Sequence, residues 1–456
     1  MLIGIDLGTS FIKGAVLDAE SLSIRHVRRR VFPEPIPNLP PLRREYDAEA
    51  IVKLVRNLID ELLPLAAPCE GVVMCTQMHG NVFVDVQGRA QSPLITWQDQ
   101  RVLEAHPAGG TFFEAMLANL SKTELDEFGN ELRPGLPIGL WYWLAERGEL
   151  PALYPAALGD YVIAALCGVP PVTELTNAAS HGALNLTRLD WNREVIHRLG
   201  LGRLQLPEIV PYGTVAGRLT IGSQSLPFFT PIGDFQCAIL GALLSPTELS
   251  LNISTGSQVS LLRPAMEFGN FQTRPFFDKQ FLITVTTLPA GRSLNALIGL
   301  LSELGRSGAN QADAWEYIIR ATEAATEPDL QINLAFYATS LGDHGAITHI
   351  REDELTVGHL FRAAFRSMAD NYFIAANRLS ATPDWERIVF SGGLAQKLAL
   401  LRHYISQRFA CSFRLSPSSE DTLLGLLALG LLFTGRSGSA GEAMALLHQR
   451  YQERQP

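Results

Sequence analysis

Two stretches, one in each half of the chain, share the same order of apolar and polar positions. Residues 1–17 (MLIGIDLGTSFIKGAVL) and 248–263 (ELSLNISTGSQVSLLR) each show an apolar run, a turn of Gly, Ser and Thr, and a second apolar run. Short apolar runs bounded by turn residues predict a strand, a turn and a strand. Overlaying the two stretches pairs Asp6 with Asn252, Thr9 with Thr255 and Ser10 with Gly256. A repeat of this kind indicates two related lobes, which we expect to bind a polyphosphate between them.

The rest of the first half continues the pattern. Strands are predicted at 2–8, 12–18 and 23–32. Residues 47–63 then have helical periodicity, because their apolar residues fall on one face. The segments GVVMCTQMHG and GNVFVDVQG follow as two further strands. Three strands, a helix and a strand, in that order, are what a ribonuclease-H-like lobe requires.

The second half repeats this order. Strands are predicted near 249–254, 257–262 and 281–287, and at IVFSGGLAQK (388–397). Helices are predicted at 293–304, 310–324, 357–380, 397–409, 421–435 and 439–453. We therefore expect an α/β protein with two ribonuclease-H-like lobes and a central cleft, residues 1–235 and 236–456. The segment Pro231–Gly233 is the expected hinge. The tail helix 439–453 is expected to pack on one of the two lobes, and the sequence leaves open which one.

The first turn has the residues of an anion site. Gly8 allows close approach of the backbone and tolerates a positive φ. Successive backbone N–H groups, together with the Thr9 and Ser10 hydroxyls, would surround a phosphate. The ammonium group of Lys13 would compensate the negative charge of that phosphate. Asp6 repels phosphate, so a divalent cation between them is expected, with Mg²⁺ favoured beside nucleotides. The alternative is an ordinary hairpin that contains glycine.

Composition narrows the class of protein. The chain has 456 residues, 47% of them hydrophobic, and a formal net charge of −9, which disfavours a nucleic-acid-binding surface. Its five cysteines are scattered, as is typical of a reducing compartment. The longest apolar stretch, Leu423 to Phe433, is too short to span a bilayer and indicates a buried helix. A strand begins almost at the N-terminus, so no signal peptide is expected, and we expect a cytoplasmic protein without a membrane or nucleic-acid partner.

Several motifs together resemble the FGGY carbohydrate kinases of the actin/hexokinase/Hsp70 superfamily. The resemblance covers nearly the whole length and rests on the order and spacing of these motifs. They are IDLGTS with Lys13, TQMHG (76–80), TWQDQR (96–101), TELTNAASHGALNL (173–186), PIGDFQ (231–236), NISTGSQ and FSGGLAQK.

The resemblance implies an ATP- and Mg²⁺-dependent sugar kinase and assigns roles to residues. Asp234 is the expected catalytic base, and Asp6 with Asp234 the expected metal ligands. The expected sugar-binding residues are Gln77, Met78, His79, Trp97, Gln98, Asp99, Arg101, Asn177, Asp234 and Gln236. Among these, Asn177 is expected, together with Ser180, to support the residues that contact the sugar. The expected nucleotide-binding residues are Gly8, Thr9, Ser10, Lys13, Thr255, Gly256, Ser257, Gly392, Gly393 and Gln396.

Within the family, Asp234-Phe-Gln236 followed by LNIST is similar to the sedoheptulokinases. The resemblance therefore implies phosphorylation of a primary hydroxyl of a ketose, with sedoheptulose (giving the 7-phosphate) as the leading substrate, by a monomer or homodimer. A pentulose kinase for xylulose or ribulose is the alternative. Two departures bear on specificity: the stretch near Gly342 lacks the family's longer loop, and Lys397 stands where an Asn is frequent.

Each expected role has a plainer alternative. Asp234 could instead cap the helix that begins FQCAILGALL, since Asp is a preferred N-cap. His79 could be a turn histidine with satisfied hydrogen bonds, and Trp97 could pack in the core. Asp99 could form a surface pair with Arg101. For the whole chain, a sugar-binding regulator without turnover and an actin-like filament protein or ATPase chaperone are the other classes. Intact Asp6 and Asp234 oppose the first class, and the sugar-side motifs oppose the second.

Overall fold

The computed structural model describes residues 1–303 and 314–452. The chain forms two compact units. Unit 1 contains residues 1–243, 273–281 and the C-terminal residues from 420 onward, and unit 2 contains the described part of 244–272 and 282–419. The chain leaves unit 1 after Leu243, so the segment expected as the hinge, Pro231–Gly233, lies inside unit 1, and its role as a hinge stays a prediction. The lobe division at residue 235 stays a prediction.

Unit 1 is built on a mixed sheet that continues from the first hairpin. Its strands run in the order β13-β14-β5-β1-β2-β3, with β15 also paired to β5. The pairs β1–β2 and β2–β3 are antiparallel, and β1–β5 is parallel. The bounds are β1 (Leu2–Leu7), β2 (Phe11–Asp18), β3 (Ser23–Val31), β5 (Val72–Thr76), β13 (Val215–Ile221), β14 (Gln224–Phe229) and β15 (Ile232–Gly233).

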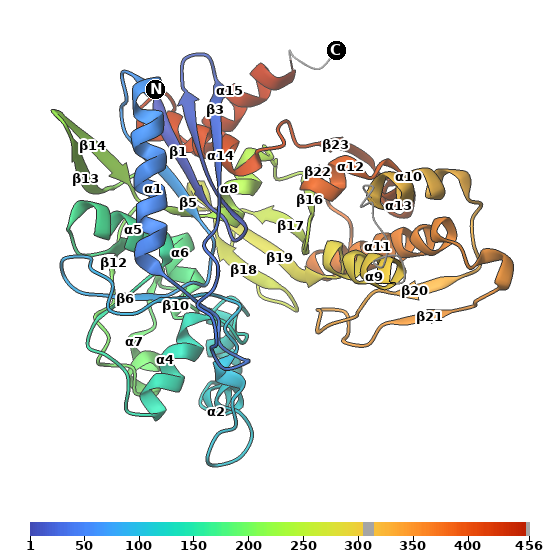
Figure 1. Cartoon of the computed structure of the whole chain (residues 1–456), viewed down its shortest axis with the longest axis horizontal. Helices are drawn as coiled ribbons and strands as arrows, with labels where there is room; N and C mark the ends of the chain where they lie inside the picture. The colour runs from blue at the N-terminus through green and yellow to red at the C-terminus, as the bar shows by residue number, and fades with distance from the viewer. Residues whose placement is uncertain (304–313, 453–456) are drawn as a thin grey trace. The chain divides into compact units, whose positions relative to one another are not determined.

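Helix α1 (Ala48–Leu62) covers one face of this sheet (Figure 1). Its first turn is capped by Asp47, whose side chain accepts a hydrogen bond from the backbone N–H of Ala50. The buried stripe of α1 includes Ile51, Val55 and Leu58, which join the core of the sheet. The predicted helix at 47–63 and the order of three strands, a helix and a strand are confirmed.

Two helices bring distant parts of the sequence together in unit 1. Helix α8 (Asp234–Gly241) packs against α14 (Asp421–Phe433) at very close range, because a Cβ on Gly425 would lie 2.0 Å from the carbonyl oxygen of Cys237. Leu423 and its neighbours in α14 are fully buried, as the apolar stretch predicted. The tail helix α15 (Ala440–Gln452) also belongs to unit 1, and Asp278 accepts from the N–H groups of Ala440 and Gly441 at its start.

Shorter elements complete unit 1. They are β4 (Glu45–Tyr46), β6 (Val82–Val84), β7 (Leu94–Ile95), α2 (Phe112–Ala118), α3 (Lys122–Glu127), α4 (Pro137–Glu146), β8 (Tyr154–Ala156), α5 (Leu158–Cys167), β9 (Val172–Thr173), α6 (Leu175–Ser180), β10 (Leu184–Asn185), β11 (Asp190–Trp191), α7 (Arg193–Arg198), β12 (Glu208–Ile209) and, from Thr273 on, β18 (Gln272–Pro275).

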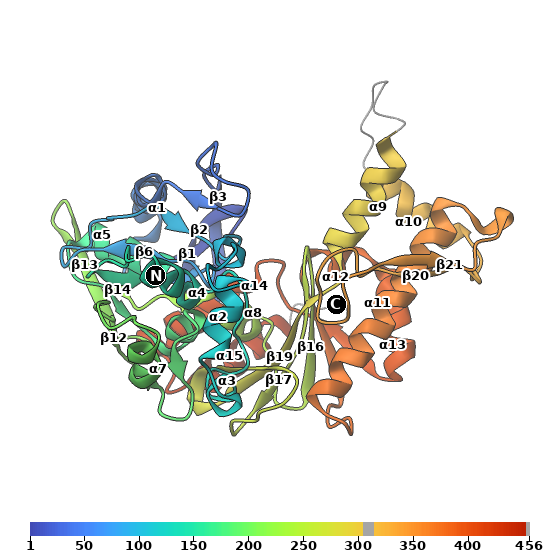
Figure 2. The same ribbon diagram turned by 90° about the horizontal axis from the view of Figure 1, so that it is seen from below.

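Unit 2 repeats the strand order with its own core. Its sheet runs β19-β17-β16-β22-β23, with β16–β17 antiparallel and β16–β22 and β22–β23 parallel. Helices α11 and α13 pack side by side (Figure 2). The bounds are β16 (Glu248–Ile253), β17 (Ser257–Arg263), β19 (Phe281–Leu288), α9 (Gly291–Glu303), α10 (Ala314–Ala324), β20 (Gln331–Asn333), β21 (Ala346–Thr348), α11 (Val357–Leu379), β22 (Arg387–Ser391), α12 (Gly393–Lys397), α13 (Ala399–Phe409) and β23 (Ser412–Leu415).

One element was assigned wrongly and one lies partly outside the described residues. The predicted strand 388–397 ends at Ser391, and GLAQK forms helix α12, because Gly392 turns the chain with φ +85°. The predicted helix 310–324 is described only from Ala314. Within the described ranges, no helix has both the length and the apolar character required to cross a membrane.

Candidate active site

The hairpin of β1 and β2 places an acid opposite a lysine in unit 1. Asp6 at the end of β1 pairs in register with Lys13 on β2, and the Lys13 Nζ lies 3.7 Å from the Asp6 Oδ2. The start of α14 supplies two further groups. Glu420 lies 2.8 Å from the Lys13 Nζ, and the hydroxyl of Thr422 donates to the Asp6 Oδ2 at 2.7 Å.

These contacts shift the pKa values of Asp6 and Lys13. Burial raises the pKa of Asp6, while Lys13 and the Thr422 hydroxyl oppose that increase. Burial alone would lower the pKa of Lys13, but the carboxylates of Asp6 and Glu420 raise it overall, so the ammonium group is charged. The lysine is about three-quarters buried. The Lys13 ammonium group therefore stands beside an exposed turn, with its charge compensated by two carboxylates.

The turn between these strands is open to solvent at Thr9 and Ser10. Gly8, which could tolerate a positive φ, does not adopt one. Glycine at this position allows the backbone of the turn to pack closely, because a Cβ on Gly8 would lie 3.0 Å from the carbonyl oxygen of Phe11. Phosphate binding by these residues stays a prediction.

Asp234 is the first residue of α8 and directly follows β15. In the register of the sheet, Gly233 stands beside Thr76 at the end of β5. The N-cap of α8 is Gly233 without a side-chain cap bond, so the idea that Asp234 caps this helix is wrong. Burial, followed by the negative charge of Asp6, raises the pKa of Asp234 to about 7. A half-buried carboxyl group that titrates near neutrality is suited to accept a proton.

A buried polar chain holds the backbone before Asp234 in place. The Thr176 hydroxyl accepts from the N–H of Gly233 at 2.8 Å and donates to Glu174, whose carboxylate also caps α6. The amide nitrogen of Asn177 donates to the carbonyl of Pro231 at 2.7 Å. Asn177 therefore acts on the Pro231–Gly233 backbone, in keeping with its expected supporting role. Glu174 and Thr176 were not singled out from the sequence.

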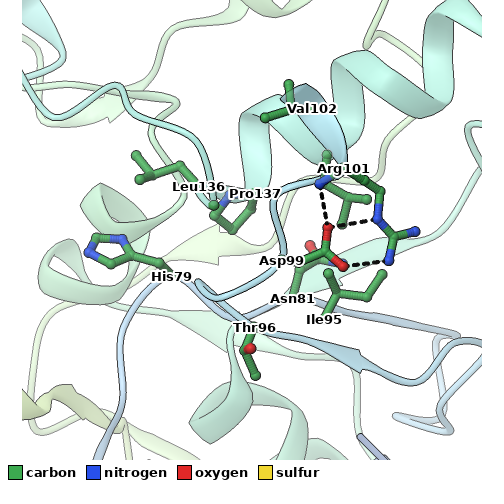
Figure 3. Close-up of a pocket in the computed structure, with 11 residues that line it drawn as sticks. His79, Asn81, Ile95, Thr96, Asp99, Arg101, Val102, Leu136 and Pro137 are labelled. Carbon is green, nitrogen blue, oxygen red and sulfur yellow. Dashed lines mark hydrogen bonds and ion pairs between the residues drawn. The ribbon is translucent and has the colours of Figure 1, made fainter. Parts of the chain in front are cut away.

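The residues predicted to bind sugar differ in their exposure and in how many hydrogen bonds they already make. Trp97 is 44% exposed, so the core-packing alternative is wrong. Asp99 is buried and accepts from the Arg101 guanidinium at 2.8 and 2.7 Å and from two backbone N–H groups (Figure 3). The Asp99–Arg101 pair considered as an alternative is therefore present, but it is buried. Sugar binding by Asp99 and Arg101 stays a prediction.

His79 has both ring nitrogens engaged. Its Nδ1 lies 2.8 Å from the carbonyl oxygen of Ser180, and its Nε2 lies 2.9 Å from the Arg133 guanidinium. Since Arg133 can only donate, the Nε2 accepts and the Nδ1 carries the proton. Burial and the positive charge of Arg133 lower the pKa of His79 to about 3, so its ring is neutral. The structure thus contains the satisfied turn histidine considered as the alternative.

The remaining predicted sugar residues surround the backbone near Gly233. A Cβ on Gly233 would lie 2.8 Å from the Gln236 Oε1 and 3.2 Å from the Met78 Sδ. The Oε1 atoms of Gln77 and Gln236 are buried acceptors with no hydrogen-bond partner in the described part of the chain. Gln98 instead accepts from the Tyr46 hydroxyl at 3.1 Å.

The cavity beside Asp99 is too small for a sugar. Its volume is about 10 Å³, and His79, Asn81, Thr96 and Asp99 contribute to its lining (Figure 3). This volume is enough for about one water molecule.

Unit 2 contains the second turn. Thr255 and Gly256 are exposed, and the space around a Cβ on Gly256 is open. Asn252 donates to the Ser391 hydroxyl at 3.0 Å, which ties this turn to the end of β22, where Gly392 and Gly393 follow. Ser257 is buried and its hydroxyl bonds to Tyr372, so it points away from the turn. Gln396 donates to the carbonyl of Ser418. Nucleotide binding by these residues stays a prediction.

No group of three or more His, Cys, Asp or Glu side chains is placed to hold a metal ion in residues 1–303 and 314–452. Asp6 and Asp234, the predicted metal ligands, are close enough for the charge of one to raise the pKa of the other. Mg²⁺ usually takes one or two carboxylates and completes its shell with water and phosphate oxygens. The residues present fit that mode of binding, and a closed protein cage is not required.

The comparisons with known proteins identify the family of the chain. The N-terminal-domain model of the FGGY family of carbohydrate kinases matches residues 1–241. The chain belongs to the FGGY family of carbohydrate kinases. Members transfer phosphate to an alcohol group of a sugar or polyol, so the chain is a sugar kinase and ATP is the phosphate donor that the family implies.

Relatives in this family cover most of the chain. Sedoheptulokinase of Mus musculus is 26% identical over 89% of this chain and 92% of its own length, and that of Homo sapiens is 27% identical over the same shares. The solved structure of xylulose kinase from Lactobacillus acidophilus has a TM-score of 0.83 and 18% identity, and covers 99% of this chain and 96% of that one. This structural match confirms the expected α/β fold of the actin/hexokinase type.

Proposed function

We propose that this FGGY kinase transfers the γ-phosphate of MgATP to a primary hydroxyl of a ketose, with sedoheptulose as the substrate and sedoheptulose 7-phosphate as the product. The placement of Asp234, half-buried at the start of α8 with a pKa raised to about 7, supports the chemistry. The substrate assignment is supported by the two sedoheptulokinases that match along most of the chain.

In this proposal Asp234 is the general base. A sugar hydroxyl is a weak nucleophile, so loss of its proton during attack assists transfer. The carboxylate of Asp234 takes that proton, the hydroxyl oxygen forms a bond to the γ-phosphorus, and the bond to the leaving ADP oxygen breaks. The chain Glu174–Thr176–Gly233 keeps the carboxylate in place, because it fixes the backbone N–H directly before Asp234.

We propose that exposed turns bind the phosphates. Thr9, Ser10 and the Lys13 ammonium group serve in unit 1, and Thr255 with Gly256 serves in unit 2. Mg²⁺, held through water by Asp6 and Asp234, would neutralise phosphate charge. Phosphoryl transfer depends mainly on such positioning and charge stabilisation.

The test is ADP release with MgATP in the presence of single sugars: sedoheptulose, fructose, xylulose, ribulose and glycerol. Asp234→Asn, run in parallel, should release almost no ADP with any of them. Sedoheptulose should give the highest kcat/KM, and the product should carry phosphate at C7 by NMR.

Other outcomes would replace the proposal. A higher kcat/KM for xylulose or ribulose would make the chain a pentulose kinase. Sugar binding by calorimetry without any ADP release would indicate a sugar-binding regulator that keeps the kinase fold.

A further inference from the structure

A charged cluster beside the His79 turn is not used by the proposed chemistry. It joins Glu131 and Arg133, from the loop before α4, to Arg274 of β18, all within unit 1. The backbone N–H of Thr273 donates to the carbonyl of Gly129 at 2.9 Å, and this bond ties β18 to that loop. Glu131 then accepts from the Arg274 Nη2 at 3.0 Å and from the Arg133 Nη1 at 3.2 Å.

The cluster has more positive than negative charge. Although burial by itself would raise the pKa of Glu131, Arg274 and Arg133 lower it to about 2, so this carboxylate is ionised. His79, the fourth member, is neutral. Two guanidinium groups thus share one carboxylate, which leaves one positive charge unbalanced within the cluster. A buried surplus charge is costly unless polar groups solvate it.

Arg133 is the member that faces solvent. Its side chain is 33% exposed, whereas those of Glu131 and Arg274 are 3% and 4% exposed. Its bonds to Glu131 and His79 hold the guanidinium group from one side. Among the described residues these bonds use two of its five N–H groups. The exposed edge is therefore a set of fixed donors.

The surroundings of Arg133 are those of the expected sugar site. Two residues further on, Gly135 has φ +93°, and a Cβ there would lie 2.1 Å from the carbonyl oxygen of Trp97. This close approach places the loop against the residue with the exposed indole. On the other side, Arg274 stacks over the ring of Phe235, the residue after Asp234, at 5.1 Å.

We propose that Arg133 is a specificity-determining residue that donates hydrogen bonds to hydroxyl oxygens of the bound ketose, at the part of the sugar remote from the reacting hydroxyl. Arg133 bonds to Glu131 and His79, and it is Arg274, on the far side of Glu131, whose charge acts on Asp234. In this proposal Arg133 therefore contacts a part of the ketose other than the hydroxyl that faces Asp234. The inference rests on the proposed ketose kinase function. It implies that a ketose with a longer chain depends on Arg133 more than a shorter one.

The test compares Arg133→Met with wild type. Met keeps much of the length of the side chain and removes every donor, while Glu131 retains Arg274. Arg198→Met is the control, since Arg198 is also an arginine of unit 1 paired with a glutamate, Glu124. For sedoheptulose, fructose and xylulose, kcat/KM is measured by ADP release and Kd by calorimetry, with the KM for ATP measured alongside.

We expect Arg133→Met to raise the Kd and KM for sedoheptulose at least tenfold, to change those for xylulose less, and to leave the KM for ATP within about twofold of wild type. Arg198→Met should change none of them. An equal loss for all three sugars, or no loss, would overturn the role of Arg133 while leaving the kinase assignment intact. If wild type neither binds nor phosphorylates any of the ketoses, both the proposed function and this inference fail.

Discussion

The replacement Asp234→Asn tests directly whether Asp234 is the general base, and the expected decrease in kcat follows from that role. Asn keeps the size of the side chain and loses the ability to take a proton. General-base catalysis is worth roughly 10²–10⁴-fold in rate, so kcat should fall at least about 100-fold. Because the pKa of Asp234 is about 7, wild-type kcat/KM should fall about tenfold for each pH unit below 7 and level off above it.

The same group predicts an effect on stability with the opposite direction. The folded protein holds the proton of Asp234 more tightly than the unfolded chain, where the pKa is near 3.8. Wild type therefore loses stability as pH rises from about 4 to about 7, and the Asn variant does not. An increase of about three in pKa corresponds to at most about 4 kcal/mol, and partial exposure of the side chain reduces this.

The assay is urea unfolding of wild type and Asp234→Asn at pH 4 and pH 8, together with the pH profile of kcat/KM. The variant should be more stable than wild type at pH 8, and the advantage should be smaller at pH 4. Asp60→Asn, on the exposed side of α1, is the matched control and should change neither quantity. Activity of Asp234→Asn above a few per cent, or a flat wild-type profile between pH 6 and 8, would refute the role of Asp234 as base.

Three further changes test other parts of the molecule. Thr176→Val removes the hydroxyl that accepts a hydrogen bond from the N–H of Gly233, so the free energy of unfolding in urea should fall by about 1–3 kcal/mol. The kcat should also fall in Thr176→Val, whereas Thr176→Ser keeps the hydroxyl and should keep the wild-type kcat. Thr9→Val should raise the KM for MgATP in steady-state kinetics and leave the Kd for sugar unchanged; unchanged kinetics would remove Thr9 from the phosphate site. Glu248→Gln weakens the buried pair with Arg414 in unit 2, and calorimetric or urea unfolding should show a loss of about 3 kcal/mol.

The local parts of this fold could be predicted from the sequence. Strands, turns and the amphipathic helix α1 depend on patterns within about 15 residues, and both hairpins were found in this way. The exception, the strand predicted through GLAQK, failed because a glycine with positive φ redirected the chain in mid-pattern. A single sequence gives no warning of such a change when the residues on both sides are apolar.

The contacts that complete the candidate site are long-range, and no local pattern indicates them. Glu420 reaches Lys13 across 407 positions, and Arg274 reaches Glu131 across 143. In the sequence, Glu420 and Asp421 directly precede the apolar run of α14, and acids in that position are typical of residues that begin a helix. That interpretation is correct for the backbone, since Glu420 is the N-cap, but it omits the side-chain partner. The family resemblance named the residues on the exposed turns and not the residues that hold them.

The pairing of Lys13 bears on how the phosphate turn would work. Its ammonium group lies nearer to Glu420, at 2.8 Å, than to Asp6, at 3.7 Å. A phosphate that approaches Lys13 must therefore compete with Glu420 for the same charge. Glu420 has a second partner, because Arg29 also bonds to it, so it does not lose all compensation when Lys13 turns toward a ligand. In the proposed phosphate site, Lys13 would leave Glu420 for the phosphate, and Arg29 would continue to compensate the charge of Glu420.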